Sequence, residues 1–124
     1  MKNMAAVLIF IFGLILPPQV GNAASDFIGV YRSATGTWYL DSNGNGLWDG
    51  CGIDDCISWG GDPSDWPVVG DWNGSGTTKI GVYRAATGIW YLDYNGNGLW
   101  DGCAIDDCIG WGGNSSDEPV VGAW

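Results

Sequence analysis

The sequence predicts an all-β protein made of two tandem copies of one small antiparallel sheet, following an N-terminal signal peptide. Three observations support this fold class. An internal repeat covers nearly all of the chain beyond residue 24, and short apolar runs alternate with turns rich in Gly and Asn. No long stretch has the 3.6-residue apolar period of an amphipathic helix. Nine Trp and five Tyr supply apolar area for a packed core despite 22 glycines.

The N-terminus has the layout of a secretory signal peptide. Lys2 precedes an uncharged apolar run over residues 4–16, two prolines interrupt it, and small residues at 21–25 offer a cleavage point. The run is shorter than the ~20 residues that span a bilayer. We therefore expect a signal peptide over 1–24 and a product that is secreted or at the cell surface, extracellular or periplasmic, with no membrane insertion after cleavage. An uncleaved membrane anchor is the alternative.

The repeat has an offset of 52 residues. Residues 28–72 align with 80–124, and nine of the 45 aligned positions differ, which leaves 36 identical. Residues 73–79 join the two copies. The predicted organisation is a signal peptide over 1–24, a first repeat with its linker loop over 25–79, and a second, truncated repeat over 80–124.

Each copy contains short runs of β-branched and aromatic residues separated by turns. In the first copy the predicted strands cover 28–32, 37–40 and 67–72. A third strand starts at Leu47-Trp48 and is continued or replaced at 57–59. Four strands in about 50 residues is the size of one β-propeller blade. The sequence therefore predicts about two blades of four strands each, an incomplete propeller, since closed propellers have about 4–8 blades.

The repeat unit is cut at both ends of the chain. The strand at 28–32 lacks the strand that would precede it, and residues 119–124 are predicted as a strand without successors. Sheets of this size become stable by stacking on neighbours. We therefore expect a homo-oligomer in which the last strand of one subunit completes the first blade of the next. A truncated gene product or neighbouring propeller repeats is the alternative.

An Asp/Asn/Gly loop in each copy has the form D-x-N-x-N-G-x-x-D. Calcium prefers about 6–8 hard oxygen ligands, and Gly at position 6 permits the sharp turn such a loop needs. Only two carboxylates serve each loop, so the predicted calcium is structural and weak, with Kd on the order of 10⁻⁴–10⁻³ M. A tight Asn-Gly turn without metal is the alternative. The predicted ligands are Asp41, Asn43, Asn45, Leu47 through its carbonyl, and Asp49, with Asp93, Asn95, Asn97, Leu99 and Asp101 in the second copy.

The linker loop that begins at Asp71 has part of the same pattern. Asp71, Asn73 and Ser75 place oxygens at positions 1, 3 and 5. Position 9 is Lys79, which removes a ligand and adds a positive charge, so this third metal site is the weakest of the candidates.

The four cysteines form two C-x₄-C pairs, Cys51 with Cys56 and Cys103 with Cys108. In an exported chain an even cysteine count predicts disulfides, here one within each repeat. Each bridge would lie just after a candidate calcium loop and could aim Asp54 or Asp106 towards the ion. A four-cysteine zinc site is the alternative.

Composition limits the other functions. The formal net charge of −10 disfavours nucleic acid as a partner, because nucleic-acid binding depends on Lys and Arg. The chain has no His, so no His-based catalytic site is available, and a glycosidase pair at Asp54-Asp55 is a weak alternative. We predict that the protein is not an enzyme. Trp66, which is Glu118 in the second copy, is the candidate for stacking on a sugar.

The segments around the linker and the first calcium loop carry a family resemblance. PVVGDWNGSGTTKIGVYR and GTWYLDSNGNGLWDG resemble the FG-GAP/VCBS-type repeats of surface proteins, relatives of the integrin α-chain propeller repeats. The resemblance implies propeller blades with calcium in hairpin loops, and a role in adhesion or extracellular recognition. Ser75 departs from the Asp usual there, and the C-x₄-C segment is not a general family feature. We expect a non-catalytic calcium-binding module for adhesion, recognition or scaffolding, with a carbohydrate-binding, lectin-like module as the alternative.

Overall fold

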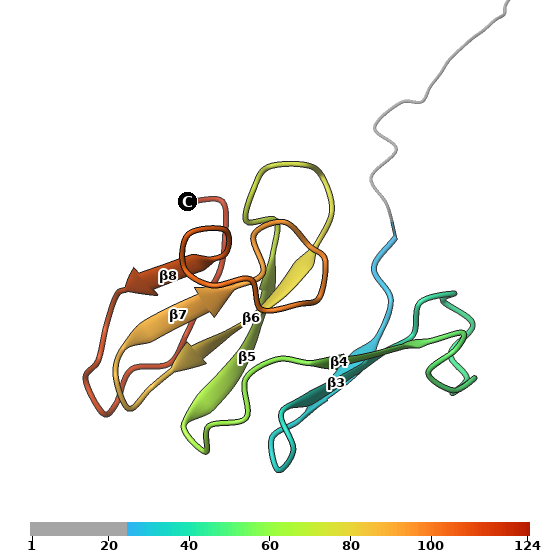
Figure 1. Cartoon of the computed structure of the whole chain (residues 1–124), viewed down its shortest axis with the longest axis horizontal. Helices are drawn as coiled ribbons and strands as arrows, with labels where there is room; N and C mark the ends of the chain where they lie inside the picture. The colour runs from blue at the N-terminus through green and yellow to red at the C-terminus, as the bar shows by residue number, and fades with distance from the viewer. Residues whose placement is uncertain (1–24) are drawn as a thin grey trace, which may run out of the picture.

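The computed structural model describes residues 25–124, and this part of the chain is all-β with no helix (Figure 1). Its seven strands form two antiparallel sheets that do not close on each other. No helix able to cross a membrane occurs among the described residues. The predicted signal peptide lies outside them.

The first sheet has three strands in the order β2-β3-β4. These are β2 (Gly29–Arg32), β3 (Thr37–Leu40) and β4 (Asp55–Ser58). A tight turn joins β2 to β3, and the N–H groups of Thr35 and Gly36 both donate to the Arg32 carbonyl. The connection from β3 to β4 is much longer and contains the first Asp/Asn/Gly loop.

The second sheet has four strands in the order β5-β6-β7-β8. These are β5 (Asp65–Gly70), β6 (Lys79–Arg84), β7 (Ile89–Leu92) and β8 (Asp107–Gly110). β5 comes from the first sequence repeat, whereas the other three come from the second. β6, β7 and β8 therefore repeat β2, β3 and β4, and β5 has no counterpart among the strands of the first sheet.

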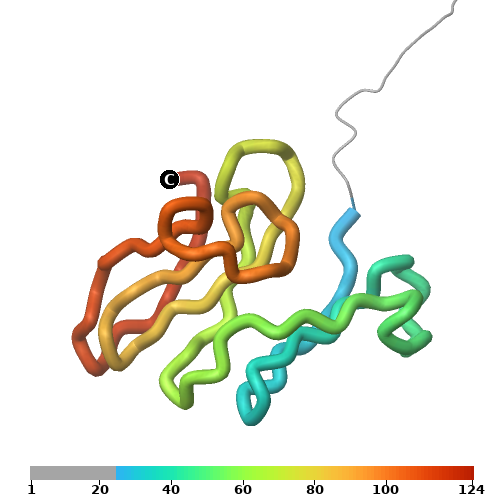
Figure 2. The backbone as a smooth tube through the Cα atoms, viewed as in Figure 1, coloured from blue at the N-terminus to red at the C-terminus, as the bar shows by residue number. Residues whose placement is uncertain are grey.

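The two sheets share one core. Trp38 and Trp59 from the first sheet and its exit pack against Ile80 and Val82 of β6, and all four side chains are buried. The Trp59 indole Nε1 also donates to the Tyr91 carbonyl across the interface, at 3.1 Å. Figure 2 traces how the chain passes from β4 directly into β5, which brings the sheets together.

Two predicted strands are wrong. Leu47-Trp48 belongs to the loop between β3 and β4, because Asp and Asn side chains take up the backbone N–H groups that a sheet ladder would need. Residues 119–124 form no strand either, although they repeat the sequence of β5. β5 pairs with β6, whereas within the described residues no free strand edge reaches 119–124. The other predicted strands of the first copy, including the one at 57–59, which is Asp55–Ser58, are confirmed within two residues.

Candidate functional site

The two complete Asp/Asn/Gly loops follow β3 and β7 and begin with an aspartate that organises the backbone. The Asp41 carboxylate accepts the N–H of Gly44 at 3.0 Å and that of Gly46 at 2.8 Å. Both glycines have positive φ, 70° and 74°, a conformation that side chains disfavour. The loop thus curls around the first aspartate because its N–H groups point inward.

The ninth position of the first loop faces the two asparagines. The Asn43 and Asn45 amide nitrogens donate to Asp49 Oδ2 at 3.2 and 2.7 Å. The Asn45 oxygen accepts the N–H of Leu47 at 2.8 Å. The structure therefore brings all five predicted residues into one loop, although Leu47 is joined through its N–H.

The second loop repeats this geometry closely. Asp93 accepts from Gly96 at 3.0 Å and Gly98 at 2.8 Å, and Asp101 accepts from Asn95 and Asn97 at 3.1 and 2.7 Å. The Leu99 N–H donates to the Asn97 oxygen at 2.9 Å. Two aligned segments 52 residues apart thus adopt the same hydrogen-bonded loop.

Asp93 is only 2% exposed. Burial raises its pKa above the ordinary value of 3.8, and the nearby Asp106 carboxylate acts in the same direction. N–H groups of the loop, chiefly that of Gly98, oppose the rise. A positive charge placed beside Asp93 would therefore stabilise its ionised form.

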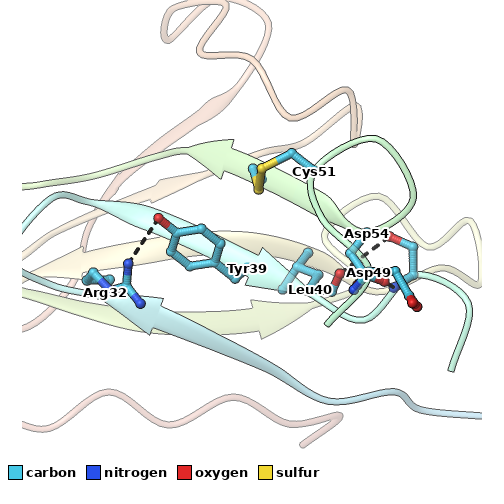
Figure 3. The surroundings of a disulfide bond; sticks show 8 residues. Arg32, Tyr39, Leu40, Asp49, Cys51 and Asp54 are labelled. Carbon is cyan, nitrogen blue, oxygen red and sulfur yellow. Dashed lines mark hydrogen bonds between the residues drawn. A yellow bond between two sulfur atoms is a disulfide. The ribbon is translucent and has the colours of Figure 1, made fainter. Parts of the chain in front are cut away.

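A buried aspartate closes each loop by accepting backbone N–H groups, whereas the sequence predicted only that Asp54 or Asp106 could point towards an ion. Asp54 is 1% exposed and accepts the N–H of Ser42 at 3.2 Å and of Asp49 at 2.7 Å, so one carboxylate joins both ends of the loop (Figure 3). Asp106 accepts the N–H groups of Tyr94 and Asp101 in the same way. The sequence offered one clue, the retention of I-D-D in both copies.

The third loop holds its own cation. The Lys79 ammonium donates to Asp71 Oδ1 at 2.9 Å, Ser75 Oγ at 2.7 Å and the Thr77 carbonyl at 2.8 Å. Asp71 otherwise accepts backbone N–H groups as Asp41 and Asp93 do, including that of Gly76 at 2.7 Å. The hydrogen bond from Lys79 is the main cause of an Asp71 pKa below the ordinary value. Asn73 accepts the Ser75 N–H and does not contact the ammonium.

Both predicted disulfides are present, and the zinc alternative is wrong because no cysteine remains free in residues 25–124. The bridges join Cys51 to Cys56 and Cys103 to Cys108, each with a Cα–Cα distance of 5.3 Å. Each ties the exit of an Asp/Asn/Gly loop to the following strand, β4 or β8, and Figure 3 shows the bridge at Cys51. Two disulfides indicate an oxidising, extracellular-type environment.

The remaining predicted site residue, Trp66, lies on β5 and is 43% exposed. It stands opposite Tyr83 in the ladder. It is therefore available at the surface, unlike the buried Trp38 and Trp59. No group of three or more Asp, Glu, His or Cys side chains suited to a metal ion occurs in the described part of the chain, so a cation in any of these loops would need amide and carbonyl oxygens as well as carboxylates.

Comparison of the chain with protein-family models, curated proteins and solved structures gave no match.

Proposed function

We propose that this chain is a non-catalytic, exported repeat module that binds calcium in the loops at 41–49 and 93–101 and serves in extracellular adhesion, recognition or scaffolding. The observation that carries the proposal is the comparison of three similar loops within one molecule. In the loop at 71–79, an ammonium group lies among the carboxylate, hydroxyl and carbonyl oxygens. The other two loops have Asp at the position of Lys79, and an external cation takes the corresponding role there.

The charges of the described residues favour this assignment. Asp93 and Asp106 are each 2% exposed and lie close enough that Asp106 raises the pKa of Asp93. Buried carboxylates are costly unless they are paired or bound to metal. The three basic residues of this region are engaged elsewhere: Lys79 with Asp71, Arg84 with Asp65, and Arg32 with the Tyr39 hydroxyl.

Calcium binding needs one local rearrangement. The Asn43 and Asn45 amides present nitrogen to Asp49. A half-turn of each amide about its last side-chain bond exchanges nitrogen for oxygen and gives two hard ligands beside the carboxylate. The backbone curl set by Asp41 and Asp54 is unchanged by this rotation. The rearrangement breaks four hydrogen bonds, two to Asp49 and two that the Asn43 and Asn45 oxygens accept from backbone N–H groups. This cost keeps the affinity in the weak range of extracellular modules, about 10⁻⁴–10⁻³ M.

The blade architecture belongs to the same proposal. The four antiparallel strands β5–β8 in sequential order fit one propeller blade, and the three strands β2–β4 fit a blade that lacks its first strand. The resemblance to FG-GAP/VCBS repeats supports calcium in the hairpin loops and a surface role. The disulfides support export.

Isothermal calorimetry on the purified protein tests calcium binding. Two weak sites are expected, and at [Ca²⁺] about 10–100 times Kd each site stabilises the fold by about 1.4–2.7 kcal/mol. Asp101→Asn should abolish one site. Asp55→Asn is the matched control, because it removes one exposed carboxylate on β4 outside the ligand pattern. If millimolar calcium gives neither heat of binding nor a change in Tm, the proposal is wrong.

The second candidate function, carbohydrate binding, is favoured by the exposed Trp66 ring. An aromatic face with nearby acidic and amide groups suits a sugar ring. A glycan array probed with the wild type and with Trp66→Ala tests it, since loss of a glycan signal in the variant alone would assign the binding to this ring.

A further inference from the structure

One edge of the first sheet and one segment of the chain are complementary. β2 pairs only with β3 among the described residues, whereas its counterpart β6 pairs with both β7 and β5. Residues 117–124 repeat β5 and its exit, yet form no strand. The molecule thus contains an open strand edge, a segment with the sequence to fill it, and an internal example of how the two fit.

The apolar side chains of the paired strand β6 are buried, whereas those of the open strand β2 are exposed. On β6, Ile80 and Val82 are 6% and 1% exposed. Their counterparts, Ile28 just before β2 and Val30 on β2, are 70% and 59% exposed. Identical residue types are therefore core in one repeat and surface in the other, and the difference is the presence of β5 and of a preceding sheet.

The far face of the second sheet lacks the covering strand that the corresponding face of the first sheet has. Trp59 is 4% exposed because β6 covers it, whereas its counterpart Trp111 is 77% exposed. A groove of about 560 Å³ lies between the second sheet and the segment 117–124. Its walls include Tyr83, Trp90, Leu92, Ile109 and Trp111. These are the counterparts of Tyr31, Trp38, Leu40, Ile57 and Trp59, which form the first-sheet side of the internal core.

The residues that fill the internal core from the other side are Ile80, Val82 and Tyr91. Their counterparts are Ile28 just before β2, Val30 on β2 and Tyr39 on β3. These side chains belong to the first sheet, whereas the groove is lined by the second sheet and the segment 117–124. A second copy brings them there. The sheet-to-sheet interface within the chain is then repeated between chains.

We propose that two copies of this chain associate head to tail, with residues 117–122 of one copy pairing antiparallel with residues 27–32 of the next. The β5–β6 ladder sets the register. Asp65 opposite Arg84 becomes Asp117 opposite Arg32, and Val69 opposite Ile80 becomes Val121 opposite Ile28. This strand pairing does not depend on calcium.

Arg32, the cation of the proposed pair with Asp117, already lies beside a tyrosine ring as its counterpart Arg84 does. In the internal ladder Arg84 donates to both Asp65 oxygens, at 2.8 and 3.1 Å, while its guanidinium lies 4.8 Å from the centre of the Tyr91 ring. Arg32 lies in the same way over Tyr39, at 4.6 Å (Figure 3). Bidentate Arg–carboxylate pairs fix geometry as well as adding energy.

The donor segment also has the local conformation of its counterpart. The Asn114 N–H donates to Asp117 at 2.9 Å, as the Asp62 N–H donates to Asp65 at 3.0 Å. Trp124 folds over Gly122, where an added Cβ would meet the ring at 2.8 Å. Trp72 folds over Gly70 in the same manner and donates from Nε1 to the Ile80 carbonyl. Residues 117–124 therefore already have local contacts of the paired segment, and strand pairing requires little further ordering of the backbone.

Head-to-tail contacts close into a ring or continue as an open chain of subunits. Each copy contributes two sheets, so about two to four copies give the 4–8 sheets of a closed propeller. The contact also covers the exposed apolar groups at both ends, the groove at Trp111 and the edge at Val30. Large exposed apolar patches of this kind mark interaction surfaces.

Reversing the charges tests the register. Light scattering measures the native mass of the wild type, Arg32→Asp, Asp117→Arg and an equal mixture of the two variants. The wild type should have a mass of at least two chains, and each variant alone should associate about 30-fold or more weakly. The mixture should recover assembly, because the two variants alternate along it. One junction then has the native pair of Arg32 and Asp117, and the next has the same pair with its charges exchanged. A second variant, Val30→Lys, should lose assembly through the apolar contact.

Controls make a failure interpretable. Ile53→Lys changes a side chain of the same exposure as Val30, 59%, outside both the proposed contact and the Asp/Asn/Gly motif, and should keep the wild-type mass. Near-ultraviolet circular dichroism confirms that each variant is folded. A monomeric wild type overturns the proposal and would point to a different donor of the strand. Assembly of both charge variants alone, or no recovery in their mixture, overturns the register.

Discussion

Removing the ammonium from the third loop tests the reasoning behind the calcium assignment. Lys79→Met keeps the hydrocarbon stem that passes Gly96 but removes four hydrogen bonds, one each to Asp71 and Ser75 and two to Thr77. The Lys79 side chain is 4% exposed and that of Asp71 is 32% exposed, so solvent screens the Asp71 carboxylate but not the Lys79 ammonium. Breaking a fully buried pair costs about 3–5 kcal/mol, and we expect about 2–4 kcal/mol here.

The assay is urea unfolding with and without calcium, with a double-mutant cycle through Asp71→Ala. For about 100 residues, a loss of 2–4 kcal/mol lowers Tm by at least about 8 °C. Calcium should restore part of this loss beyond the gain seen in the wild type, since the vacated oxygens accept an external cation. If Lys79→Met costs less than about 0.5 kcal/mol, a cation is not what holds such a loop, and the comparison with 41–49 and 93–101 fails.

Three further outcomes are expected. Asp106→Ala should destabilise the fold by about 2–4 kcal/mol, since two partly buried backbone N–H groups lose their acceptor, whereas Asp107→Ala should change it by less than about 0.5 kcal/mol in the same urea titration. Reducing the two bridges should cost about 2 kcal/mol for each by the loop-entropy relation, read together as the Tm difference with and without reductant. Because the pKa of Asp93 is raised by burial, the native state binds more protons at this group. Its contribution to calcium-free stability should therefore fall as pH rises from 3.8 through the folded value, and saturating calcium should abolish that fall in urea titrations across this range.

The strands of this fold were largely predictable, because their apolar and β-branched residues stand in short runs between turns. The loop after β3 was not. Asn-Gly pairs indicated a tight hairpin that would return at Leu47-Trp48, whereas the chain returns at Asp55. The reason is Asp54, whose carboxylate accepts N–H groups from both ends of the loop. Asp54 lies outside the D-x-N-x-N-G-x-x-D motif at 41–49. A single residue of this kind leaves no repeating sequence pattern from which its role in closing the loop could be predicted.

The grouping of strands into sheets was also beyond the sequence. A tandem repeat has no inherent starting point, so the same 52-residue period can be divided before β2 or before β5. The structure groups β5 with the following repeat because the loop at 71–79 returns the chain directly onto β6, whereas β4 and β5 are joined by a crossing into the next sheet. The residues of the Asp/Asn/Gly motifs, in contrast, could be identified from the sequence because they are contiguous, and their binding of calcium stays a prediction.

The exposed apolar residues connect folding with assembly. Ile28, Val30 and Trp111 are the same residue types as Ile80, Val82 and Trp59, which form the internal core. A surface that faced only water would gain nothing from these side chains, whereas a surface that repeats the internal interface requires them. If the copies associate as proposed, the first sheet gains a fourth strand only in the assembled state, so its stability is linked to protein concentration. The Tm should then rise with concentration in the wild type and stay constant in Val30→Lys.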